Sequence, residues 1–95
     1  MEFEWNESKA IANLQKHLVS FQEATTVFTN PLAVISSDNL HSENEYREII
    51  IGHSQRNRLL FVAFTERDDY IRIISARLAT RKETKDYERN IIESN

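Results

Sequence analysis

Apolar and polar residues recur at helical spacing in two segments of the first third of the chain. We expect a first helix over about residues 7–17, because the Asn6 side chain is suited to cap its free backbone N–H groups. Its apolar stripe would consist of Ile11, Leu14 and Leu18, which recur at the spacing of one helix face. The pattern therefore predicts a helix that packs on the rest of the protein through these three side chains.

A second helix is expected after the capping box Ser-Phe-Gln-Glu, in which Ser20 and Glu23 would satisfy each other's backbone N–H groups. Pro31 must end this helix, because proline cannot continue one. The opening residues, MEFEW, alternate apolar and acidic positions. They predict a short strand or an extended lead-in to the first helix.

After residue 31 the hydrophobic period shortens to two, which predicts strands. Polar turns separate the last three of them and favour hairpins. The expected strands lie within residues 32–36, 41–54, 56–66 and 69–79. A further capping box, Thr-Arg-Lys-Glu at residues 80–83, starts a terminal helix. The order predicts one α+β domain over residues 1–95: two N-terminal helices, an antiparallel meander of about four strands, and one C-terminal helix.

Strict alternation assigns the side chains of the last strand to two faces of the sheet. It predicts that Arg72 points to one face with Ile74 and Ala76, whereas Arg77 points to the other with Ile73. The strand before it is apolar on both faces through its middle. We therefore expect helices to cover both sides of the sheet centre.

Composition narrows the class of protein. The 95 residues are 40% hydrophobic and 28% charged, which is ordinary for a soluble globular domain. The lack of cysteine excludes disulfides, thiolate metal sites and a cysteine nucleophile. The three histidines fall in three different segments, so we expect no metal and no cofactor. The acidic N-terminus and short apolar runs predict neither a secretory signal nor a membrane span, so we expect a cytoplasmic protein.

Charge is unevenly distributed along the chain, although the net charge is only −3. Residues 1–50 hold three Lys or Arg against eight Asp or Glu, whereas residues 51–95 hold nine against seven. A chain polarised in this way can offer a basic surface to a polyanion despite an acidic total.

The first helix offers one candidate surface. Lys9, Asn13, Lys16 and His17 share one helical face. This face is either simply solvated or a phosphate-binding edge with a titratable imidazole, and the spacing leaves both interpretations open.

The other candidate groups each have an ordinary structural explanation. Glu83 occupies the third position of a capping box, and Tyr87 follows one turn later, where it can simply pack. Arg47 has acidic neighbours that suit a cross-strand ion pair, and Arg67 lies in a turn beside two aspartates. No nucleophile elbow, P-loop or dinucleotide-binding fingerprint is present.

Taken together, these positions form an ordered pattern. Its N-terminal part is Phe-x-Trp, a lysine four residues later, then Asn, Lys-His, Phe and Glu-Ala, carried by Phe3, Trp5, Lys9, Asn13, Lys16, His17, Phe21, Glu23 and Ala24. Its C-terminal part consists of Glu45, Arg47, Ile51, Gly52, Thr65, Arg67, the stretch from Arg72 to Arg77, Ala79, Glu83 and Tyr87. The pattern resembles the BrnT-type toxins of type II toxin–antitoxin systems over about residues 3–88. Asn6 replaces a usual acidic residue and Leu18 a usual small one, and neither change removes a candidate active group.

The resemblance implies a RelE-like fold and a ribonuclease that halts translation. It also implies a BrnA-type antitoxin encoded alongside, and a toxin–antitoxin complex in which the antitoxin makes the DNA contacts. RNA would be the substrate, and DNA would be bound only indirectly.

Metal-independent RNA cleavage suits the available residues. When the 2′-OH attacks the adjacent phosphorus, negative charge builds on the phosphoryl oxygens, and fixed arginines stabilise that charge. The catalytic candidates are Arg77, Arg47, Arg67, His17, Glu83 and Tyr87, with the general base unassigned. The candidates for RNA binding are Lys9, Lys16, Arg72 and Arg81.

Within this set we expect Arg77 to lie near the N-terminus of the last helix and to hold the scissile phosphate. Arg47 would complete its cluster, with Arg67 as a weaker candidate. Arg72, on the other face, would instead pair with a carboxylate in a structural role. The alternative function is a non-catalytic interaction module of the same fold that binds an antitoxin or RNA. A DNA-binding regulator is disfavoured because the terminal helix mixes both signs of charge.

Overall fold

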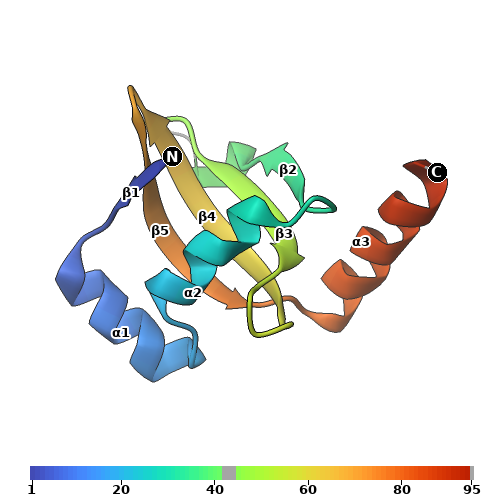
Figure 1. The fold of residues 1–95 in the computed structure, drawn as a ribbon, viewed down its shortest axis with the longest axis horizontal. Coiled ribbons are helices and arrows are strands. Elements are labelled where there is room, and N and C mark those ends of the chain that lie inside the picture. Colours follow the sequence, from blue (N-terminus) through green and yellow to red (C-terminus); the bar gives the residue numbers. More distant parts are fainter. Residues whose placement is uncertain (42–44, 95) are drawn as a thin grey trace.

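The structure is a computed structural model that describes residues 1–41 and 45–94. Its elements follow the expected order (Figure 1). They are β1 (Glu2–Glu4), α1 (Glu7–His17), α2 (Phe21–Thr26), the 3₁₀ turn η1 (Val27–Thr29), β2 (Val34–Ser37), η2 (Asn39–His41), β3 (Glu48–His53), β4 (Leu59–Arg67), β5 (Tyr70–Leu78) and α3 (Arg81–Ser94). None of the helices in these ranges is long and apolar enough to cross a membrane.

The strands form one five-stranded sheet in the order β1-β5-β4-β3-β2. The meander from β2 to β5 is antiparallel, as expected, but the sheet is mixed because β1 pairs parallel with β5. We had expected about four strands, all antiparallel. The sheet has a fifth strand, β1, and this strand is parallel to its neighbour. The MEFEW segment is that extra strand: Phe3 pairs with Ile71 and packs against the core.

The core lies between one face of the sheet and the N-terminal helices (Figure 1). Its buried residues come from α1, α2, the two segments that follow these helices, and the central strands: Ala10, Val19, Phe21, Ala24, Val27, Ile50, Leu60, Val62, Phe64, Ile71, Ile73 and Ala76. We had expected a helix to cover the other face of the sheet as well, but none in the described part of the chain does. Instead, α3 projects from the edge of the sheet and packs only sparsely against it.

The first helix has the expected limits and the expected cap, since Asn6 Oδ1 accepts from Lys9 N at 3.0 Å. Its predicted apolar stripe was wrong: Ile11, Leu14 and Leu18 are 54%, 48% and 71% exposed. The face that packs on β5 instead presents the small Ala10 and the polar Asn13.

Asn13 explains this orientation, because it fastens α1 to the edge of the sheet. Its amide nitrogen donates to the carbonyl oxygens of Val19 (3.0 Å) and Ala76 (2.8 Å), and its oxygen accepts from Ala76 N at 3.2 Å. β1 pairs with β5 only as far as Arg72. Beyond that point the Asn13 side chain takes the place of a neighbouring strand and satisfies buried backbone groups that would otherwise lack partners.

A β-bulge changes the side-chain pattern of β5. Ser75 pairs with Ala63, but Ile73 pairs with Phe64, so Ile74 is an extra residue. Alternation shifts by one across it. As a result Ile73 and Ala76 both face the core, while Arg72 and Arg77 both face the opposite side. The prediction that these two arginines lie on opposite faces was wrong, because the period-two pattern contains no sign of the extra residue.

We call the three hydrogen bonds of the Asn13 side chain to Val19 and Ala76 the Asn13 clamp. Removal of this one side chain should have a large effect on stability. Asn13→Ala should lower the free energy of unfolding by about 2–3 kcal/mol, because it leaves buried backbone groups of Val19 and Ala76 without partners. Denaturant unfolding measures this. The exposed Gln15 on the same helix is the control, and Gln15→Ala should change stability by less than about 0.5 kcal/mol. Equal stability of the two variants would contradict the role given to Asn13.

Candidate active site

The bulge gathers polar side chains on the sheet face that points away from α1 and α2, which we call the arginine face. Strand register assigns its members, because directly paired residues point to the same side. They are Ile49, Ile51 and His53 of β3, Leu59, Phe61, Ala63, Thr65 and Arg67 of β4, and Tyr70, Arg72, Ser75 and Arg77 of β5.

Arg77 is the most elaborately held of these arginines. Its Nη1 and Nη2 donate to the two carboxylate oxygens of Glu83 at 2.8 and 2.9 Å, and Nη1 also donates to Leu78 O at 3.2 Å. Its Cζ lies 4.0 Å from the centre of the Phe61 ring, which supports the flat guanidinium from below. These contacts fix the group in one position while a third of the side chain stays exposed.

The hydrogen bonds of Arg77 leave one edge of its guanidinium group available to bind a ligand. A guanidinium carries five N–H donors. Glu83 takes the end-on fork between Nη1 and Nη2, and Leu78 takes the second Nη1 hydrogen. Among the described residues, the Nε hydrogen and one Nη2 hydrogen have no acceptor. They form the side-on edge of the guanidinium, which can bind two oxygens of a phosphate.

Glu83 holds Arg77 from the first turn of α3. The Thr80–Glu83 capping box is confirmed: Thr80 N donates to Glu83 Oε1 at 2.9 Å, and Glu83 N donates to Thr80 Oγ1 at 3.1 Å. Arg77 is the main cause that holds the pKa of Glu83 below its ordinary value, and Glu83 in turn raises the pKa of Arg77. An ionised carboxylate of this kind positions Arg77 well but is a weak proton acceptor.

Three other arginines cluster at the far end of β5. Arg67 Nη2 donates to Glu45 at 2.7 Å, and Arg72 Nη1 lies 3.1 Å from Glu4. Arg67 lowers the pKa of Glu45, with smaller contributions from Arg47 and Arg72, so all three lie near this carboxylate. Arg72 therefore has the carboxylate partner that we expected.

Arg47 does not complete the Arg77 cluster, contrary to our expectation. It directly precedes β3, whose first residue pairs with Phe64, whereas Arg77 pairs with Phe61. Arg47 therefore lies at the end of the sheet that carries Arg72. Arg72 and Arg77 are five residues apart in one strand, which spans at most about 16 Å at 3.3 Å per residue.

Tyr87 lies one helical turn after Glu83, on the side of α3 that faces the protein. It is buried, and its hydroxyl donates to Leu32 O at 3.0 Å. Burial raises the pKa of Tyr87. This phenol is thus a structural contact that ties α3 to the segment before β2, and it is poorly suited to accept a proton.

The candidates on α1 lie apart from Arg77. The helix packs against the core side of the sheet, opposite the arginine face (Figure 1). Lys9 and Lys16 are exposed, and His17 is half-buried at the end of the helix. Asn13, the fourth member of that surface, is committed to the backbone of Ala76 and Val19. The structure does not bring these residues to the Arg77 cluster.

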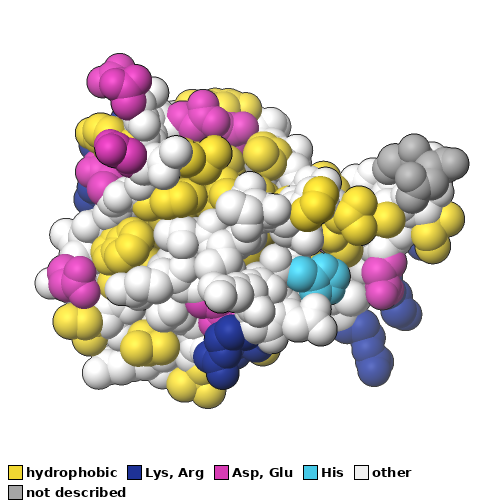
Figure 2. Space-filling view, in the orientation of Figure 1, with side chains coloured by type: hydrophobic (Ala, Val, Ile, Leu, Met, Phe, Trp, Pro, Cys, Tyr) yellow, Lys and Arg dark blue, Asp and Glu magenta, His cyan; other side chains and the backbone are white. Residues whose placement is uncertain are grey.

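Arg81 is the first residue of α3 and is exposed, four residues beyond Arg77. Figure 2 shows Lys and Arg side chains gathered along the lower edge of the molecule, around the β3–β4 turn and the start of α3, with acidic side chains mainly at the upper left. These basic side chains lie near the end of the sheet at which β3 and β5 finish.

One charged cluster was missed by the sequence analysis. Glu23 was expected to form a capping box with Ser20, in which each side chain binds the other residue's backbone N–H. Only half of this box forms: the Ser20 hydroxyl accepts from Glu23 N at 3.0 Å. The buried Glu23 carboxylate instead accepts from Ser54 Oγ at 2.7 Å and from Arg58 Nε at 2.9 Å, with a further contact to Arg58 Nη2. Arg58 lowers the pKa of Glu23. Residues 23 and 58 carry no local pattern that could have predicted this pair.

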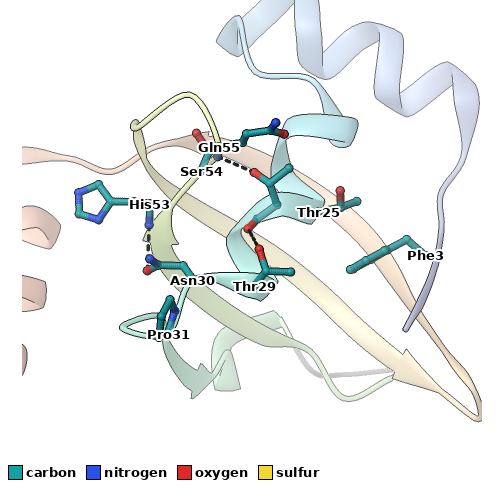
Figure 3. Close-up of a pocket in the computed structure, with 9 residues that line it drawn as sticks. Phe3, Thr25, Thr29, Asn30, Pro31, His53, Ser54 and Gln55 are labelled. Carbon is teal, nitrogen blue, oxygen red and sulfur yellow. Dashed lines mark hydrogen bonds between the residues drawn. The ribbon is translucent and has the colours of Figure 1, made fainter.

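The sequence analysis did not single out His53. It ends β3, and its backbone N–H donates to Asn30 Oδ1 at 3.3 Å. Its ring meets the Tyr87 ring edge-on, with 5.9 Å between centres. Figure 3 shows the imidazole pointing away from Asn30 and Thr29, on the side of α3.

A polar hollow lies on the other side of His53, and Figure 3 shows its lining. The lining carries hydroxyl and amide groups but no carboxylate or guanidinium: Phe3, Thr25, Thr26, Thr29, Asn30, Pro31, His53, Ser54 and Gln55. Within residues 1–41 and 45–94, no three His, Cys, Asp or Glu side chains are grouped to hold a metal ion.

Comparison with known proteins identifies the family. The model of the family described as "Ribonuclease toxin, BrnT, of type II toxin-antitoxin system" matches residues 5–83. The chain belongs to the BrnT ribonuclease toxin family. It is thus the toxin component of a type II toxin–antitoxin system, and the family implies an antitoxin partner.

A solved structure supports the same fold. The chain is similar to the crystal structure of the Brucella abortus ribonuclease toxin BrnT, with a TM-score of 0.67 and 21% sequence identity over 85% of this chain and 99% of that one. No curated protein matched the sequence. The expected BrnT resemblance is confirmed.

The Arg77–Glu83 pair predicts a pH dependence of stability. Because the pKa of Glu83 is lowered in the folded protein, the pair stabilises the fold above pH 4.5, the ordinary value for glutamate, and this contribution is lost as pH falls further. Glu83→Gln should therefore be less stable than the natural protein at pH 7, and the difference should shrink below pH 4.5. Thermal melts across this range measure the effect. A difference independent of pH would contradict it.

Proposed function

We propose that this chain is an endoribonuclease that binds the scissile phosphate of RNA with Arg77 and inhibits translation by cleavage. One observation carries the assignment: Arg77 is fixed by Glu83 over Phe61 with its side-on edge available, on the sheet face that also bears Arg72. Membership of the BrnT ribonuclease toxin family supports the reaction class.

Arg77 would act by electrostatic stabilisation. Attack of the ribose 2′-OH on phosphorus increases the negative charge on the phosphoryl oxygens, and a guanidinium already in place stabilises that charge without reorganising. Glu83 is a positioning residue in this scheme, because it holds Arg77 and touches no reacting atom. Since guanidinium groups supply the positive charge, we propose that cleavage needs no metal ion.

The second arginine cluster would contact neighbouring phosphates of the same RNA strand. Arg67 and Arg72 each carry an exposed or half-buried guanidinium that forms an ion pair with a carboxylate, and Arg47 lies close to Glu45. Arg81 would extend the contact at the other end. Exposed ion pairs of this kind contribute only about 0–1 kcal/mol, so an RNA phosphate can compete for the arginine.

The partner that we propose is a BrnA-type antitoxin, through which the complex would reach DNA, and the proposed compartment is the cytoplasm. A non-catalytic interaction module is the second candidate. It is favoured by one observation, namely that Arg67, Arg72 and Arg77 all pair with carboxylates in the free chain.

Growth and RNA integrity test the choice between these functions. Expression of the chain alone in a bacterium should stop growth and degrade RNA, because no antitoxin is present to neutralise it, and co-expression of the antitoxin should restore growth and RNA integrity. Normal growth with intact RNA, in cells that contain soluble folded protein, would support the interaction module and refute the nuclease.

Purified variants test the role of Arg77. Arg77→Ala should reduce RNA cleavage, measured in excess EDTA, by about 100-fold or more, as expected for loss of a preorganised charge. Arg77→Lys should restore only part of the rate, because an ammonium cannot bind two oxygens side-on. Arg89→Ala, on exposed α3 surface, removes the same charge and should cleave normally. Full activity of a folded Arg77→Ala protein would refute the assignment.

A further inference from the structure

His53 lies on the arginine face, across the sheet from Arg77. In the β3–β4–β5 register, Arg77 pairs with Phe61 and Phe61 with Ile51, and His53 follows Ile51 by two residues on the same face. His53 and Arg77 are separated by two strand spacings across the sheet and by two residues along the strand direction. Together these separations place their Cα atoms about 12 Å apart. The Arg77 guanidinium reaches over Phe61 and thus covers part of that distance.

The inner side of α3 connects the two residues. Glu83 binds Arg77, and Tyr87, one turn further along α3, contacts the His53 ring. A helical turn rises 5.4 Å. The imidazole is therefore placed roughly one turn along α3 from the Arg77–Glu83 pair, with the Phe61 ring lying between β3 and β5.

Other titratable groups near Arg77 are engaged elsewhere. Both carboxylate oxygens of Glu83 accept hydrogen bonds from Arg77, and one of them also accepts from Thr80 N. The Tyr87 hydroxyl is buried and donates to Leu32 O. His17 belongs to α1, on the opposite side of the sheet. The His53 residue is exposed, and its ring nitrogens have no hydrogen-bond partner among the described residues.

From this geometry we propose that His53 is the general base of the RNA cleavage reaction, an inference that rests on the proposed function. A ring nitrogen takes the proton of the ribose 2′-OH as its oxygen bonds to phosphorus. The bond from phosphorus to the 5′ oxygen then breaks, and that oxygen takes a proton from water. The products are a 2′,3′-cyclic phosphate and a 5′-hydroxyl, and His53 returns its proton to solvent.

The surroundings of His53 determine how its pH profile should be interpreted. On the α3 side it shares an apolar hollow with the titratable groups Tyr87 and Glu88. On the other side it meets the neutral groups of Asn30, Ser54 and Gln55. Glu88→Gln therefore serves as the control for an effect of this neighbouring carboxylate on the pH profile.

The test compares cleavage of a short RNA by the natural protein, His53→Ala and the neighbouring Gln55→Ala. His53→Ala should lower kcat by about 100-fold or more, the usual contribution of a general base, and change KM by less than about threefold. Binding of an uncleavable 2′-O-methyl RNA should be unchanged. Added imidazole should restore part of the rate, and the rising limb of the pH–rate profile should disappear. In Glu88→Gln that limb should persist.

Two results would overturn the assignment while leaving the nuclease function intact. In one, the His53→Ala variant keeps the kcat of the natural protein while the His17→Ala variant is inactive. This result would assign the general base to the first helix. The other is a loss in His53→Ala that follows a loss of RNA binding and is not rescued by imidazole, which would make His53 a packing residue for Tyr87. An inactive natural protein would instead refute the proposed function itself, and His53 with it.

Discussion

The extra residue Ile74 in β5, together with the Asn13 clamp just beyond it, sets the arrangement of the whole molecule. The bulge lets one strand present Ile73 and Ala76 to the core and both Arg72 and Arg77 to the other face. Asn13 then holds the backbone of Ala76 where β1 no longer pairs with β5. Because bulges locally disrupt the strand ladder, a side chain that binds both backbone groups nearby stabilises the irregular edge.

Each side of the sheet follows from this constraint. On the core side, the clamp fixes which face of α1 packs, so the small and polar Ala10 and Asn13 are buried while three larger apolar side chains stay exposed. On the other side, two arginines that simple alternation would separate share one surface. The proposed RNA-binding face is therefore a product of strand irregularity, and α1 and α2 support it from behind without contributing its reactive groups.

Pairing with carboxylates gives the arginines fixed positions. Glu83 contributes most clearly, because one carboxylate caps α3, binds Arg77 at two nitrogens and leaves the side-on edge of the guanidinium available. The same helix brings Tyr87 against His53. α3 packs only sparsely on the sheet, and these two contacts help to hold it in place together with the hydrogen bond from the Tyr87 hydroxyl to Leu32 O. The geometry of the proposed site and the position of the last helix thus depend on the same few bonds.

The sequence by itself determined the local features of this protein. The caps at Asn6, Ser20 and Thr80, the limits of the first helix, the meander and the BrnT resemblance were all predicted, because each depends on neighbouring residues or on their order. The tertiary structure alone decided the bulge, the parallel β1 strand, the buried side of α1, the pairing of Glu23 with Arg58 and the grouping of Arg47 with Arg72. These depend on strand register and on contacts between residues far apart in the chain. A shift of one residue in register moves every later side chain to the other face of the sheet, and no local pattern in the sequence records it.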